Sequence, residues 1–123
     1  MTMLRRHKYV LTALLIYWPA IFILTHMPVP DMARKSGMSD KTMHLLAYLL
    51  LVFLWWFAIS PYKKADWRKA KPWLTLALMV WYGAFDEWLQ LFIQGRSAHI
   101  IDFLSDLAGT VLGLLILSFF TFW

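Results

Sequence analysis

Nine polar side chains that are able to transfer protons or bind ligands lie in or beside three long apolar stretches of this chain. They are, in chain order, Lys41, His44, Tyr48, Asp86, Glu87, Gln90, Arg96, Asp102 and Asp106. An ionisable group inside an apolar segment of membrane length is energetically costly, so such a group indicates a functional site. His44 and Tyr48 are four residues apart, so a helix would present them on one face.

One interpretation of these residues is acid–base catalysis. Carboxylates that are crowded among tryptophan and leucine side chains tend to keep a proton near neutral pH. An imidazole exchanges protons in the same pH range. We therefore regard His44, Glu87 and Asp86 as the candidate catalytic residues.

A second interpretation is the binding of an anionic ligand in the outer leaflet. The guanidinium of Arg96 is suited to paired hydrogen bonds with a phosphate or a carboxylate. Lys41, Tyr48 and Gln90 are the further substrate-binding candidates, and His44 would add a hydrogen bond.

Two more interpretations remain open. Asp102 and Asp106 are candidate ligands of a divalent metal ion, together with Glu87 and His44, because carboxylate oxygens and imidazole nitrogens bind such ions. A divalent metal is therefore the candidate cofactor. Alternatively, the carboxylates only form ion pairs with basic residues and fix the packing of the helices.

Four apolar stretches are long enough to form the transmembrane helices that would position these side chains. The chain has 123 residues, of which 61% are hydrophobic, and the apolar residues fall in blocks rather than alternating. A helix crosses the hydrocarbon core with about 20 residues. The expected spans cover residues 9–25, 41–60, 73–93 and 101–123 of a single domain over 1–123. The predicted fold is therefore an all-α bundle of four transmembrane helices.

The positive charges predict how the bundle sits in the membrane. Lysine and arginine are concentrated before the first span, at residues 5–8, and in the connection at residues 63–71. Such segments stay in the cytoplasm, so both termini are predicted to be cytoplasmic. The net charge of +5 is then explained by orientation and by anionic lipids, and nucleic acid is not an expected partner. Pro72 is expected in the first turn of the third span.

With this orientation, the candidate residues lie toward the outer ends of their spans. Glu87 is six residues, or about 9 Å, from the end of the third span at residue 93. Asp102 and Asp106 open the fourth span, and Arg96 precedes them. A proton-coupled carrier would place its site near the midplane, so it fits this one-sided arrangement less well.

The fourth span carries a narrow stripe of special residues. Asp102, Asp106, Gly109 and Gly113 follow the spacing i, i+4, i+7 and i+11. The two glycines form a G-x-x-x-G pair, which allows another helix to approach closely. We therefore expect the two aspartates to point into the bundle rather than toward lipid.

Three segments resemble motifs of the VanZ-like membrane protein family. Residues 40–48 resemble its D-K-x-x-H-x-x-x-Y segment, and residues 86–90 resemble its D-E-x-x-Q segment. Residues 95–113 resemble its G-R … D-x-x-x-N-x-x-G-x-x-x-G ending, with order and spacing kept.

The chain departs from the family pattern at three positions. Leu45 stands where the family often has an aromatic residue, and Gln94 stands where a proline often precedes Gly-Arg. Asp106 stands where asparagine is usual, which adds a charge and favours metal or acid–base chemistry.

The resemblance implies a bacterial protein of the cytoplasmic membrane and cell envelope, from a family whose namesake is associated with teicoplanin resistance. The family implies no particular reaction, so enzymatic activity stays open. We expect an extracytoplasmic polar site that binds, and in one version modifies, an envelope lipid or a lipid-linked cell-wall component. The alternative is an accessory membrane protein whose polar network only packs the helices. No oligomeric state follows from the sequence.

Overall fold

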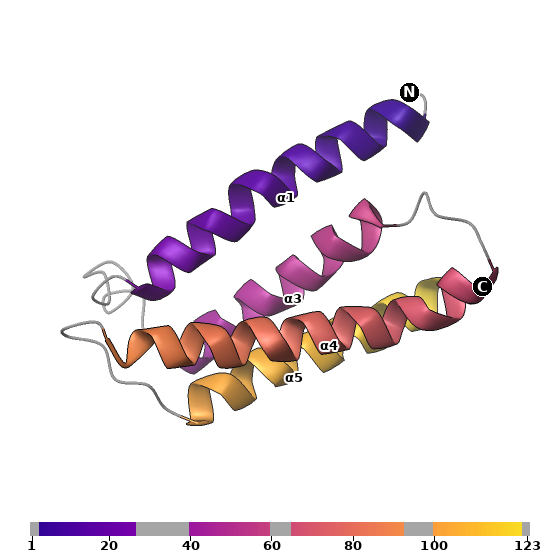
Figure 1. The fold of residues 1–123 in the computed structure, drawn as a ribbon. Helices are drawn as coiled ribbons and strands as arrows, with labels where there is room; N and C mark the ends of the chain where they lie inside the picture. Colours follow the sequence, from indigo (N-terminus) through magenta and orange to yellow (C-terminus); the bar gives the residue numbers. More distant parts are fainter. Residues whose placement is uncertain (1–2, 27–39, 60–64, 93–99, 122–123) are drawn as a thin grey trace.

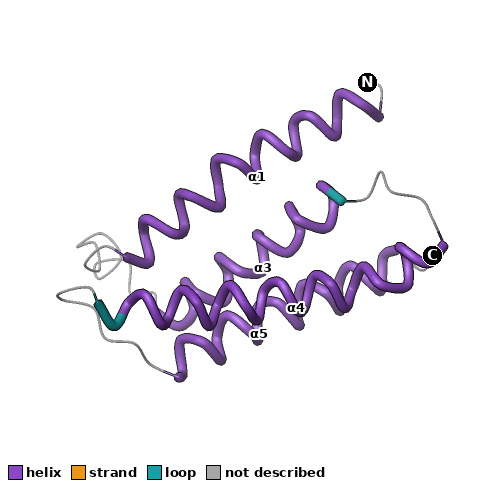
Figure 2. Tube along the Cα trace, in the orientation of Figure 1, coloured by secondary structure: helices purple, strands orange, loops and turns teal. Residues whose placement is uncertain are grey.

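The computed structural model describes residues 3–26, 40–59, 65–92 and 100–121, and Figure 1 shows that they form four α-helices. The helices are α1 (Met3–His26), α3 (Asp40–Ala58), α4 (Ala65–Gln90) and α5 (Ile100–Thr121). No strand occurs in these residues, and only short loop segments follow α3 and α4 (Figure 2). The prediction of an all-α, four-helix fold is confirmed.

Three of the four helices are long and apolar enough to cross a membrane. The qualifying segments are Arg5–Leu24, Lys41–Ala58 and Ile100–Phe120. Helix α4 does not reach the same apolar character, since it carries charged residues near both of its ends. It nevertheless packs alongside α5 and α3 within the bundle (Figure 1). All four helices expose large apolar side chains, as expected for surfaces that face lipid.

Helix α3 holds the bundle together, because it packs against α1, α4 and α5. Half of the buried apolar core residues belong to α3, including Tyr48, Leu51, Val52 and Trp56. The four helices run alternately up and down, so the start of α1, the end of α3, the start of α4 and the end of α5 lie together on the right of Figure 1. The start of α3, the end of α4 and the start of α5 lie together at the opposite end.

The expectation for Pro72 is wrong. Helix α4 begins at Ala65, so Pro72 lies inside the helix rather than in its first turn. Proline lacks an N–H and therefore removes one backbone hydrogen bond, to the carbonyl four residues earlier. The segment before Pro72 is rich in alanine, lysine and arginine, which favour helix, and the helix continues through the proline.

The glycines of α5 allow α3 to approach α5 closely. A Cβ atom added at Gly109 would overlap the main-chain carbonyl oxygen of Leu45 and lie 3.0 Å from its carbonyl carbon. A Cβ atom at Gly113 would lie 3.1 Å from a methyl group of Val52. The predicted glycine stripe therefore faces α3, and its aspartates are buried with it, as expected.

Candidate functional site

The centre of the polar cluster is a hydrogen bond between α3 and α5. His44 Nδ1 and Asp106 Oδ1 are 2.8 Å apart, and both side chains are almost fully buried. Since a carboxylate accepts hydrogen bonds, the N–H at Nδ1 is the donor, and Nε2 is the basic nitrogen. This arrangement of carboxylate and imidazole orients a histidine for proton transfer or for metal binding.

Glu87 of α4 joins this pair from a third helix. One ligand atom each from His44, Glu87 and Asp106 lie within 4.8 Å of one another, and all three residues are buried. Here we call these three residues the His44–Glu87–Asp106 cluster. Each member comes from a different helix, so the cluster exists only when α3, α4 and α5 are packed together.

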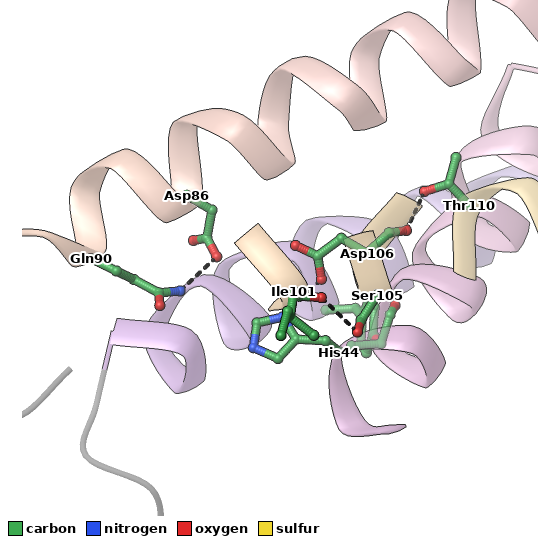
Figure 3. Close-up of polar contacts among 9 residues, drawn as sticks. His44, Asp86, Gln90, Ile101, Ser105, Asp106 and Thr110 are labelled. Carbon is green, nitrogen blue, oxygen red and sulfur yellow. Dashed lines mark hydrogen bonds and ion pairs between the residues drawn. The ribbon is translucent and has the colours of Figure 1, made fainter. Parts of the chain in front are cut away.

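Asp86 and Gln90 form a second polar pair on α4, beside the cluster. Gln90 Nε2 donates to Asp86 Oδ2 over 3.1 Å, and both side chains are 0% exposed. The two residues are one helical turn apart, and Figure 3 shows their side chains on the side of α4 that faces His44 and Asp106. The Asp86 and Gln90 side chains therefore form a polar boundary beside the cluster.

Tyr48 closes the site toward the bundle interior. Its hydroxyl is buried and has no hydrogen-bond partner within the described part of the chain. The ring stacks on Tyr82 of α4 with a centroid distance of 5.9 Å, and Tyr82 meets Trp18 of α1 edge-on at 5.3 Å. An aromatic wall thus separates the polar site from the rest of the core.

Comparison with known proteins agrees with this arrangement. The sequence model of the VanZ/LLP1 family matches residues 8–121, which is nearly the whole chain. The chain belongs to the VanZ/LLP1 family. The resemblance to VanZ-like proteins is therefore confirmed, and so is a membrane protein of this family. Neither a search of curated proteins nor a search of solved structures gave a significant match.

In this VanZ/LLP1 protein, the other predicted site residues that the structure describes are not part of the cluster. Asp102 is buried one turn before Asp106, but it is not a member of the cluster. Lys41 is exposed near the start of α3. Arg96, the predicted anion-binding residue, lies outside the residues that the structure describes.

Two residues of this VanZ/LLP1 site were missed in the sequence. Thr110 is buried one turn after Asp106, and its hydroxyl donates to the Asp106 carbonyl over 2.9 Å (Figure 3). Tyr82 is four residues before Asp86 and lies against Tyr48. The four-residue spacing from an aspartate was the available signal in both cases, because it places these residues on the buried face.

A separate charged group is buried at the opposite end of the VanZ/LLP1 bundle. Lys71 precedes Pro72, and its Nζ lies 4.0 Å from the ring centroid of Trp56. Burial lowers the pKa of Lys71 to about 8. Since Lys71 lies near the start of α4 and Glu87 near its end, the lysine does not belong to the polar site.

Proposed function

We propose that this VanZ/LLP1 protein binds and chemically modifies an envelope lipid or a lipid-linked cell-wall component at the His44–Glu87–Asp106 cluster. The observation that carries the proposal is the buried hydrogen bond between His44 and Asp106, with Glu87 within 4.8 Å. Ionisable groups are costly inside a membrane bundle, and three of them on separate helices converge at one point. Such a convergence is typical of a site built for binding or catalysis.

The depth of the cluster favours a lipid headgroup as the ligand. His44 is four residues into α3, Glu87 is three residues before the end of α4, and Asp106 is six residues into α5. At 1.5 Å per residue, these positions lie about 5–9 Å inside the same end of the bundle. A headgroup reaches this depth without leaving the leaflet that holds its acyl chains.

The distribution of lysine and arginine supports an extracytoplasmic site in the bacterial cytoplasmic membrane. The basic residues at 5–8 and 68–71 lie at the starts of α1 and α4, at the end of the bundle opposite the cluster. Segments of this kind remain in the cytoplasm. The cluster then faces the outer leaflet, where envelope lipids and lipid-linked cell-wall precursors are presented.

The chemistry proposed for the site is proton transfer. His44 Nε2 accepts a proton from a hydroxyl or a water, and Asp106 stabilises the imidazolium through Nδ1–H. Glu87 acts as the second acid–base group, while Gln90, Tyr48 and, beyond the described residues, Arg96 bind the headgroup.

Lipid retention by the purified protein tests this proposal. We expect native mass spectrometry in detergent to find one envelope lipid per chain in the wild type, and a strong loss of that lipid in His44→Ala and Glu87→Gln. Circular dichroism and gel filtration must show that both variants remain folded. If the wild type and both variants carry the same lipids, the proposed site is wrong.

Glycopeptide susceptibility gives a cellular test of the same site. If the family association with teicoplanin extends to this chain, expression of the wild type lowers teicoplanin susceptibility and expression of His44→Ala does not. Equal susceptibility in the two strains, at equal protein levels, would separate this protein from glycopeptide resistance.

A structural role is the second candidate function, and the position of the hydrogen bond favours it. His44 and Asp106 join α3 to α5 beside the Gly109 contact, where a polar clamp would fix the packing. A clamp predicts that every single substitution in the cluster lowers the melting temperature without changing which lipids are retained.

A further inference from the structure

We infer that the His44–Glu87–Asp106 cluster binds a divalent transition-metal ion. The inference concerns the same site as the proposed function, and it names a resident ion that the lipid proposal does not require. It rests on the geometry of the three ligand atoms, on a carboxylate oxygen of Asp106 that is buried without a partner in the described part of the chain, and on the negative charge of the two carboxylates.

The distances within the cluster match a coordination sphere. Ligand atoms that lie about 2.0–2.1 Å from a first-row ion are about 2.9 Å apart at right angles and about 4.2 Å apart when opposed. His44 Nδ1 and Asp106 Oδ1 are 2.8 Å apart, and one ligand atom from each of the three residues falls within 4.8 Å of the others. A bound ion would take the place of the Nδ1 proton, so the hydrogen bond and the bound ion are alternative states of this pair. Rotamer adjustments of a few tenths of an ångström would therefore bring all three atoms onto one ion.

The second oxygen of Asp106 points to an additional ligand. Asp106 is 1% exposed, and its Oδ2 is buried without a hydrogen-bond partner among the residues that the structure describes. A Cβ atom placed at Gly83 would lie 3.6 Å from this oxygen, so Oδ2 faces α4. Glu87 is one turn beyond Gly83 on the same helix. A buried carboxylate oxygen aimed at the helix that carries the third ligand is explained by an ion between them.

The negative charge of the two carboxylates also favours a bound cation. Two carboxylates lie within 4.8 Å of one another in a membrane bundle, and the imidazole beside them is neutral when it binds a metal. A divalent cation would cancel the charge of both carboxylates and remove the repulsion between them. The three ligands come from three regular helices, one each from α3, α4 and α5.

The ligand types select the class of ion. One imidazole and two carboxylates suit Zn²⁺, Mn²⁺ or Fe²⁺, whereas Ca²⁺ and Mg²⁺ prefer all-oxygen sites. Tyr48 has a buried hydroxyl without a described partner, and it lies one turn below His44 on α3. It is placed to hydrogen-bond a water or a substrate oxygen on the ion.

Asp102 provides a matched comparison for the test. Asp102 and Asp106 are buried aspartates on the same face of α5, and only Asp106 is in the cluster. Replacing each with asparagine removes the same charge at neighbouring depths. If ion binding depended only on the total negative charge, both variants would lose the ion equally. If the ion binds at the cluster, only Asp106→Asn loses it.

The experiment measures metal directly in the purified full-length chain. The wild type, Asp106→Asn, Glu87→Gln and Asp102→Asn are stripped with a chelator in detergent, reloaded with Zn²⁺ or Mn²⁺ alone, and desalted. We expect elemental analysis to find one ion per chain in the wild type and in Asp102→Asn. We expect a loss of affinity of at least tenfold in Asp106→Asn and Glu87→Gln by calorimetric titration, with unchanged helical circular dichroism.

Cobalt substitution adds a readout that does not depend on affinity. The visible spectrum of bound Co²⁺ reports the geometry and the nitrogen ligation of the site, so His44→Gln should change the spectrum of any ion that is retained. Folding is checked independently by the melting temperature of each stripped protein.

Three results would overturn the inference. These are a wild type that holds no more ion than Asp106→Asn, an equal loss in Asp102→Asn and Asp106→Asn, and a cobalt spectrum that is the same with and without His44. Lipid retention is recorded on the reloaded samples as well. A reloaded wild type that retains a lipid but no ion refutes the metal and leaves the lipid proposal standing, and a reloaded wild type that retains an ion but no lipid does the reverse.

Discussion

Gly109 of α5 lies directly against the main-chain carbonyl of Leu45 on α3. Leu45 follows His44 in sequence, and Gly109 is three residues after Asp106. The backbone contact therefore sets the separation at which the two helices present His44 and Asp106 to each other. The hydrogen bond of 2.8 Å between His44 and Asp106 therefore depends on Gly109, which has no side chain.

Substitution of Gly109 should therefore disturb both packing and function. A Cβ atom in Gly109→Ala would overlap the Leu45 carbonyl, which forces α3 and α5 apart. Overpacking of this kind costs about 1–3 kcal/mol. We expect a lower melting temperature in detergent and a loss of the ligand that the cluster retains.

Gly83→Ala is the control for this prediction. Its Cβ atom would meet Phe103 at 3.4 Å and Asp106 at 3.6 Å, which is ordinary van der Waals contact. Alanine is also more favourable than glycine in a helix interior, by about 1 kcal/mol. A melting temperature that falls as far in Gly83→Ala as in Gly109→Ala would contradict the proposed role of the α3–α5 contact.

The coupling between His44 and Asp106 can be measured with a double-mutant cycle. Directly bonded residues show interaction energies of about 0.5–3 kcal/mol, and we expect a value in this range for His44→Gln combined with Asp106→Asn. The free energy of unfolding in mixed detergent gives the four corners of the cycle. Additive effects would show that the two side chains act separately.

Glu87 should affect function more than folding. Glu87→Gln keeps the size and the hydrogen-bonding atoms of the side chain but removes its charge and its ability to exchange a proton. We expect a folded, membrane-inserted protein whose lipid or metal retention falls at least tenfold. Trp88→Phe, at the exposed neighbouring position on α4, serves as the control and should retain the ligand at the wild-type level.

Lys71 should make stability depend on pH at the end of the bundle away from the site. Burial lowers the pKa of Lys71 from 10.5 to about 8, so the folded state prefers the neutral amine. Below pH 8 the buried charge is unfavourable in the folded state. Between pH 8 and 10.5 the unfolded chain binds more protons than the folded chain, so the stability contributed by this group rises with pH.

Melting temperatures from pH 7 to pH 10 test this prediction. Lys71→Met should be more stable than the wild type at pH 7, and the difference should shrink as the pH rises. Lys69→Met, at an exposed position two residues earlier, is the matched control. A constant difference between Lys71→Met and the wild type across the range would contradict the prediction and would show that the cation–π contact with Trp56 cancels the effect of burying the charge.

Features within single helices could be predicted from the sequence. The apolar blocks gave the four helices, and the spacing of Asp106, Gly109 and Gly113 gave the buried face of α5. Both follow from the 3.6-residue period of a helix. The same rule correctly placed His44 and Tyr48 on one face of α3, since both side chains are buried.

Relationships between helices could not be predicted in the same way. His44 and Asp106 are 62 residues apart, and their pairing depends on the axial register of α3 against α5, which the backbone contact at Gly109 fixes. Asp102 fits the sequence pattern of a metal ligand as well as Asp106 does, and only the register separates them. The continuation of α4 through Pro72 also depends on tertiary packing, which can outweigh the loss of one hydrogen bond.

The three-helix origin of the cluster has a consequence for biogenesis. The chain delivers α3 to the membrane first, then α4, and Asp106 arrives only with α5. During synthesis His44 and Glu87 are therefore already embedded before their partner on α5 exists. Until α5 inserts, the hydrogen bond from His44 to Asp106 is unable to form, so the polar cluster of α3 and α4 is incomplete. The site is thus finished only when α5 packs into the bundle.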